Sequence, residues 1–150
     1  MNERFRELPP ERQKAILLAD SKMSEILDFF ELMTYAAIKK IRVLVENPYI
    51  VDFAVRSFYT DKEEISDDLK NMKVKGISQN YEQFLSKTDC SKFKDGVNPH
   101  NIWNMIVWMT DGYVHERQMR NRPLCFDEIE KEFKNWIQMF KQFSYKEEYL

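Results

Sequence analysis

The side chains best suited to chemistry are few in this chain and are spaced too widely to form a known catalytic motif. His100 and His115 are the only histidines, and neither belongs to an H-E-x-x-H or E-x-x-H pattern that would place metal ligands on one helical face. Asp111 and His115 are four positions apart and can pair across one helical turn, but no nucleophile stands beside them. A structural or solvated pair is therefore favoured over a metal or catalytic role.

The remaining reactive groups also lack partners in the sequence. Cys90 and Cys125 occur singly, without metal-ligand spacing, and two thiols in a chain of this size favour a reducing compartment. No glycine-rich phosphate loop, nucleophile elbow or cysteine dyad is visible. We expect no enzyme, no catalytic residue, no metal and no cofactor.

Composition predicts an all-α protein without a basic surface that could bind nucleic acid. Three glycines and five prolines in 150 residues are too few turn-forming residues for a protein with many strands. Sustained alternation of apolar and polar residues is also absent. The 23 basic and 25 acidic residues give a net charge of −2, so no basic stripe is expected to neutralise phosphates. No signal-like start and no long apolar run occur, which favours a soluble, intracellular protein that does not enter a membrane.

Apolar periodicity and capping signals predict the helices of the first half. One apolar face recurs from Ile26 to Leu44, and Asn47 and Pro48 both end that helix and start the next. A third helical segment is predicted from Thr60, which has Glu63 at capping-box spacing, and Gly76 is a plausible kink within it.

The second half is predicted to contain a loop and two long helices. The polar segment 87–98 contains Gly96 and is expected to be a loop. Asn98 and Pro99 then start a helix that ends near Met119. Apolar residues lie around almost the whole circumference of this helix, so other parts of the protein must pack against more than one of its sides. A last helix is predicted from about Asp127.

The beginning of the chain is predicted to be the remnant of a DNA-binding domain. Residues 1–20 include LPPERQKAILLA, which has the pattern of one helix, whereas a helix-turn-helix reader needs two more helices joined by a short turn. The sequence passes from Ala19, Asp20 and Ser21 directly into SKMSEILDFFELM. Either the reader was lost from this protein, or residues are missing between Asp20 and Ser21.

The order of these segments resembles the tetracycline-repressor (TetR) family of transcriptional regulators. LPPERQKAILLA is similar to the first helix of that family, and DFFELMTYAAIKKIRVLVENPYIVDFAVRSFY is similar to two of its regulatory helices. VNPHNIWNMIVWMTDGYVHERQ, followed by FDEIEKEFKNWIQMF, is similar to its final two helices. The resemblance implies a TetR-like ligand-binding and dimerisation domain over residues 21–150, with the DNA-reading helices missing, so no DNA-binding residue can be assigned.

The resemblance also implies a ligand cavity lined by aromatic and methionine side chains from separate helices. Such sites are mostly apolar and carry a few placed polar groups, which favours an apolar or aromatic effector. The alternative is that the same side chains simply fill a core. The expected ligand-binding residues are Tyr35, Phe58, Tyr81, Trp103, Trp108 and Met109, and Tyr35, Tyr81 and Thr110 are the candidate polar groups.

The last two helices are expected to form a homodimer interface. Their combined apolar surface exceeds what a soluble monomer usually leaves exposed, and pairing with a symmetry mate in a four-helix bundle would cover it. The predicted interface residues on the final helix are Ile129, Phe133, Trp136, Ile137 and Phe140.

The function expected from the resemblance is a bacterial, cytoplasmic TetR-type regulator, most simply a repressor, whose DNA binding is controlled by a small effector. Duplex DNA would then be bound only through a reader that this chain lacks. The alternative is a helical dimeric interaction module or ligand-binding protein without DNA-binding activity.

Overall fold

The computed structural model describes residues 22–49 and 85–150, and these ranges are predominantly helical. Within them no β-strand occurs, and a single isolated antiparallel bridge joins Phe93 to Tyr145. The elements of these ranges include α3 (Phe29–Glu46), η2 (Cys90–Lys92), α6 (Pro99–Met119), α7 (Phe126–Ser144) and η3 (Glu147–Tyr149). The prediction of an all-α chain is therefore confirmed for the residues described.

Some of the sequence predictions lie outside these ranges. The first helix of residues 1–20, the helical segment from Thr60 and the two ligand-binding candidates Phe58 and Tyr81 all fall in 1–21 or 50–84.

Helix α3 begins at a side-chain cap that the apolar periodicity alone does not reveal. Asp28 has an extended backbone, and its Oδ1 accepts a hydrogen bond of 3.0 Å from the backbone N–H of Glu31. The helix therefore starts at Phe29 and not at Ile26. It ends where the sequence predicts, at Asn47, whose N–H donates to the carbonyl of Leu44.

Helices α6 and α7 also have the bounds that their local signals predict. Asn98 caps α6 by accepting from the His100 N–H at 2.9 Å, and Pro99 occupies its first turn. The helix ends at Met119, and Asn121 follows with a φ of +52° in the left-handed region that favours asparagine among non-glycine residues. α7 starts one residue before the predicted Asp127.

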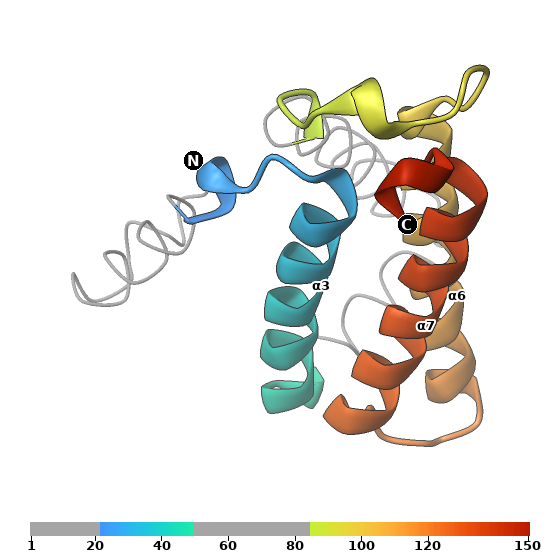
Figure 1. The fold of residues 1–150 in the computed structure, drawn as a ribbon. Coiled ribbons are helices and arrows are strands. Elements are labelled where there is room, and N and C mark those ends of the chain that lie inside the picture. Colours follow the sequence, from blue (N-terminus) through green and yellow to red (C-terminus); the bar gives the residue numbers. More distant parts are fainter. Residues whose placement is uncertain (1–21, 50–84) are drawn as a thin grey trace, which may run out of the picture.

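The three long helices stand side by side, with α7 between α3 and α6 (Figure 1). α3 and α6 run in the same direction and α7 runs opposite to both, so the start of α3 and the end of α7 share one end of the bundle. The segment 85–97 crosses that end.

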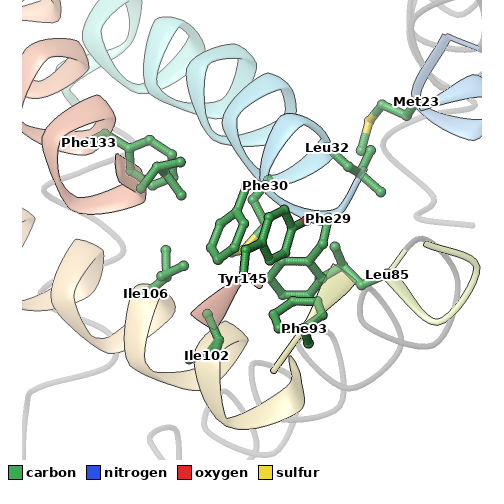
Figure 2. Close-up of a cluster of buried hydrophobic side chains, with 12 residues drawn as sticks. Met23, Phe29, Phe30, Leu32, Leu85, Phe93, Ile102, Ile106, Phe133 and Tyr145 are labelled. Atoms are coloured by element: carbon green, nitrogen blue, oxygen red, sulfur yellow. The ribbon is translucent and has the colours of Figure 1, made fainter. Parts of the chain in front are cut away.

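The core is centred on the first turns of α3 (Figure 2). Phe29 and Phe30 are 0% and 2% exposed, and their rings meet edge to face at a centroid distance of 5.2 Å. Phe93 stands 5.2 Å from Phe29, and Tyr145 stands 4.9 Å from Phe30, both edge to face. Such aromatic pairs add about 0.5–1.5 kcal/mol each beyond the burial of their area.

The predicted loop over residues 87–98 is confirmed, since its only helical element is the three-residue η2, and backbone hydrogen bonds hold it in place. Its backbone is tied to α3 by the Asp89 N–H, which donates to the Leu27 carbonyl at 2.8 Å. It is tied to the end of α7 by the Lys94 N–H, which donates to the Ser144 carbonyl at 2.8 Å. These bonds hold the ends of two helices together from a segment remote from both in sequence.

Candidate functional site

A half-buried carboxylate, an ammonium group and a phenol meet at the end of the bundle where α3 begins and α7 ends. Oδ2 of Asp28 accepts hydrogen bonds from Nζ of Lys92 at 2.9 Å and from the hydroxyl of Tyr145 at 3.1 Å. We call these three residues the clasp. The Asp28 side chain is 11% exposed and that of Lys92 is 29% exposed, so the pair is largely shielded from water.

The clasp changes the pKa of all three groups. Burial opposes the charge on Asp28, but hydrogen bonds from the Glu31 N–H, Lys92 and Tyr145 outweigh it and lower the pKa of Asp28 below 3.8. The bond to Asp28 raises the pKa of Lys92. Burial first, and then the negative charge of Asp28, raise the pKa of Tyr145 far above 10.0.

This arrangement fastens helices together and offers no reactive group. At neutral pH the carboxylate is charged and every member has a partner, whereas a general acid or base needs a pKa near the working pH. The clasp therefore joins η2 to the ends of α3 and α7, which is a structural role.

A small hollow lies between the end of α3 and the end of α6. Its volume is about 70 Å³, and its lining is Leu44, Val45, Pro48, Val114, Arg117, Gln118, Arg122, Pro123 and Leu124. Arg117 forms an ion pair with Glu128 and its guanidinium stands 5.5 Å from the centre of the Tyr113 ring. Pockets for drug-sized ligands measure about 300–1,000 Å³, so this hollow is too small for such an effector.

A larger depression of about 320 Å³ lies on the outer surface of α7, and its lining is charged. The residues around it are Asp127, Glu130, Lys131, Lys134 and Asn135. It is wide open to solvent, and its lining lacks the apolar walls expected for an apolar ligand.

The structure does not bring the described ligand-binding candidates together. Tyr35 and Trp103 are half-buried at the edge of the core. Trp108 is 66% exposed and Met109 is 38% exposed. Positions 103 and 108 are about 140° apart around a helix of 3.6 residues per turn, so Trp103 and Trp108 lie on different faces of α6. The sequence pattern showed that α6 is apolar all round but not which face the core would cover.

The residues expected to form the dimer interface are divided between core and edge. Ile129, Phe133 and Ile137 are 0%, 1% and 8% exposed, because α7 packs them against the rest of the chain. Trp136 and Phe140 are half-buried beside that core. Three of the five side chains are thus covered within a single chain, and a dimer would need other side chains of the same helix.

Exposed apolar side chains instead form a face on the last two helices. On α6 they are Met105, Trp108, Met109 and Met119, and on α7 they are Met139 and Phe143. We call these six residues the outer face. Tyr113 and Trp136 stand 5.7 Å apart and fix the register of the antiparallel pair. Counting one turn from them brings Met109 level with Phe140, so Met105, Trp108 and Met109 lie beside the α7 pair, whereas Met119 lies about 15 Å further along α6.

Other classes of site are not formed by the residues described. Among residues 22–49 and 85–150, no three histidine, cysteine or acidic side chains lie close enough to hold a metal ion together. None of the helices in these ranges has the length and hydropathy needed to cross a bilayer.

Comparison of the chain with protein-family models, curated proteins and solved structures found no match.

Proposed function

We propose that this chain is the dimerisation and effector-binding part of a TetR-type transcriptional regulator, most simply a repressor. The observation that supports this best is the outer face, an exposed apolar surface on the two helices that the family resemblance assigns to dimerisation. The proposed protein works in the bacterial cytoplasm. A small apolar or aromatic effector favours one arrangement of the regulatory helices. Its binding thereby changes the distance between the DNA-binding domains of the two subunits.

The size of the outer face argues for a partner in solution. With roughly 200 Å² for a large side chain, the exposed fractions of its six residues correspond to on the order of 700 Å². The largest apolar patch on a typical monomer is about 300–600 Å², and a stable interface buries about 800 Å² per partner. The outer face therefore supplies most, but not all, of the area that a stable dimer interface buries, and the rest would come from the polar side chains around it.

Light scattering on the purified chain tests the dimer directly. We expect a dimer at micromolar concentration and a monomer for the double variant Trp108→Glu, Phe143→Glu, because two desolvated charges would lie inside the interface. Lys131→Glu is the matched control, since it adds a negative charge at an exposed position of α7 away from the outer face. A wild-type chain that stays monomeric at this concentration would refute the dimer.

The regulatory part of the proposal needs a second test. The chain itself should bind no specific duplex, because its sequence has no recognition helix and a net charge of −2. Sequencing the gene across the codons of Asp20 and Ser21 shows whether a reader lies between them. A protein that includes such a reader should bind a palindromic site near its own gene and release it on addition of an effector.

The second candidate is a dimeric interaction module without DNA binding. It is favoured by the sequence, in which one predicted helical segment, LPPERQKAILLA, is followed almost directly by SKMSEIL. A gene with no codons between Asp20 and Ser21, combined with a dimer that ignores DNA fragments near that gene, would establish this candidate over the regulator.

A further inference from the structure

The starting observation is a glycine in the middle of α6 that the packing of residues 22–49 and 85–150 does not require. Gly112 is exposed, and a Cβ added to it would meet nothing within 4 Å. Glycine in a helix interior weakens folding by about 2–5-fold in the equilibrium constant relative to alanine. Because this cost has no return in the packing of the described residues, we look for a second copy of the chain that approaches the helix closely at this point.

Two residues of the outer face, Met105 and Met119, lie at equal distances on either side of this glycine. Met105 stands seven positions before Gly112 and Met119 seven positions after it, and seven positions are nearly two full turns. All three therefore lie on one side of α6. Met105 is 36% exposed and Met119 is 70% exposed, so both ends of this stripe are open to a partner.

We propose that the two-fold axis of the homodimer passes beside Gly112, where α6 crosses its symmetry mate in the antiparallel sense. This inference rests on the proposed dimer and specifies its geometry. About such an axis a position before Gly112 meets the equivalent position after it on the other chain, because an isologous interface pairs each patch with itself. Met105 then packs against the partner's Met119, and the absence of a Cβ at the crossing lets the two backbones come close.

The charged side chain on this side of α6 does not oppose the binding of a second copy of the chain. Glu116 is the charged residue of the stripe, and it is paired with Arg120 at 2.8 Å. It lies four positions from Gly112, about 6 Å along the helix, so an axis at Gly112 separates the two copies of Glu116 by about 12 Å. Each Glu116 is instead level with the partner's Trp108, whose indole N–H can donate to a carboxylate.

The variant Gly112→Ala should affect the stability of the folded monomer and the stability of the dimer in opposite directions. Because alanine favours the helix, the variant should unfold at equal or higher urea concentration when measured as a monomer. Its dimer dissociation constant should nevertheless rise by about tenfold or more, since two methyl groups force the crossing helices apart. Analytical ultracentrifugation over a dilution series measures the constant, and Ser24→Ala, at an exposed position outside α6, is the control.

Disulfide trapping gives an independent measurement of the axis. In a Cys90→Ser, Cys125→Ser background, Gly112→Cys should form a covalent dimer under mild oxidation, because a disulfide needs Cα atoms about 4.4–6.8 Å apart. The pair Met105→Cys and Met119→Cys, on separate chains, should link to each other, and Lys131→Cys should not link.

The outcomes distinguish the axis from the dimer. A wild-type monomer overturns both this inference and the proposed dimer. A wild-type dimer whose constant is unchanged by Gly112→Ala, with no covalent dimer from Gly112→Cys, overturns the axis alone. Weakened association together with trapping at Gly112 supports it.

Discussion

Removing the carboxylate of the clasp should destabilise the chain in two separable steps. Asp28→Asn keeps a good helix cap, because asparagine and aspartate are equally preferred there, but removes the charge that binds Lys92 and Tyr145. A charge-assisted hydrogen bond contributes about 1.5–3 kcal/mol and a neutral one about 0.5–1.5 kcal/mol. We therefore expect Asp28→Asn to lower the free energy of unfolding by about 1 kcal/mol, which is a shift of about 2–4 °C in Tm.

Asp28→Ala should cost more, because it also removes the cap and leaves the Tyr145 hydroxyl without its acceptor. The cap contributes about 1 kcal/mol and an unsatisfied buried group costs about 1–3 kcal/mol. Together with the loss of the charge, the expected decrease in the free energy of unfolding is about 3–5 kcal/mol. Urea unfolding followed by circular dichroism at 222 nm, a standard helix signal, measures both variants, and the order of stability should be wild type, Asp28→Asn, Asp28→Ala.

The pH dependence gives the sharper test of the same reasoning. The folded pKa of Asp28 lies below 3.8, so its stabilising contribution is complete above that unfolded value and is lost as the pH falls through the lower folded value. The difference between wild type and Asp28→Asn should therefore be constant from pH 7 down to about 5 and shrink below it. An Asp28→Asn variant as stable as wild type at pH 7, or a gap of equal size at pH 7 and pH 3, would refute the role assigned to the charge.

Three further perturbations test the fold. Phe133→Ala should lower the free energy of unfolding by about 3–5 kcal/mol in urea titrations whatever the oligomeric state, because the ring is 1% exposed within one chain; a loss below 1 kcal/mol would contradict its place in the core. Above pH 10.0, wild type should lose stability, since the pKa of Tyr145 is raised in the folded state and its contribution disappears as the pH rises through that value; Tyr145→Phe should show a flatter profile between pH 9 and 11, and equal slopes would count against it. Gly96→Ala should destabilise by about 1 kcal/mol, because Gly96 has a φ of +83° although a Cβ there has open space; an unchanged urea midpoint would exclude strain at this turn.

The helix ends could be predicted from sequence wherever a local signal marks them. Asn98 followed by Pro99 fixes the start of α6, and Asn47 fixes the end of α3, because caps act over one turn of backbone. The start of α3 carries such a signal too, since Asp28 precedes Glu31 at capping-box spacing. Apolar periodicity placed the start at Ile26, because periodicity reports a buried face and not the point where helical hydrogen bonding begins.

The clasp and the order of segment 85–97 could not be predicted in the same way. Lys92 lies 64 positions from Asp28, and Tyr145 lies 117 positions from it. Periodicity and capping relate residues within a few turns of one helix, whereas these bonds depend on how separate helices meet. A polar segment that contains Gly96 predicts the loop correctly, but the bonds that hold this loop to α3 and α7 depend on where those helices lie.

The last two helices show that an apolar surplus in the sequence does not reveal which of its side chains the chain itself covers. The sequence stripe of α7 runs through Ile129, Phe133 and Ile137, and α7 uses that stripe first to cover its own core. A helix packed on two neighbours leaves its remaining apolar side chains on a flank about 90° from the core, where Met139 and Phe143 stand at 68% and 69% exposure. The proposed dimer must therefore use that flank, and if it does, charges introduced there should weaken association without first unfolding the monomer.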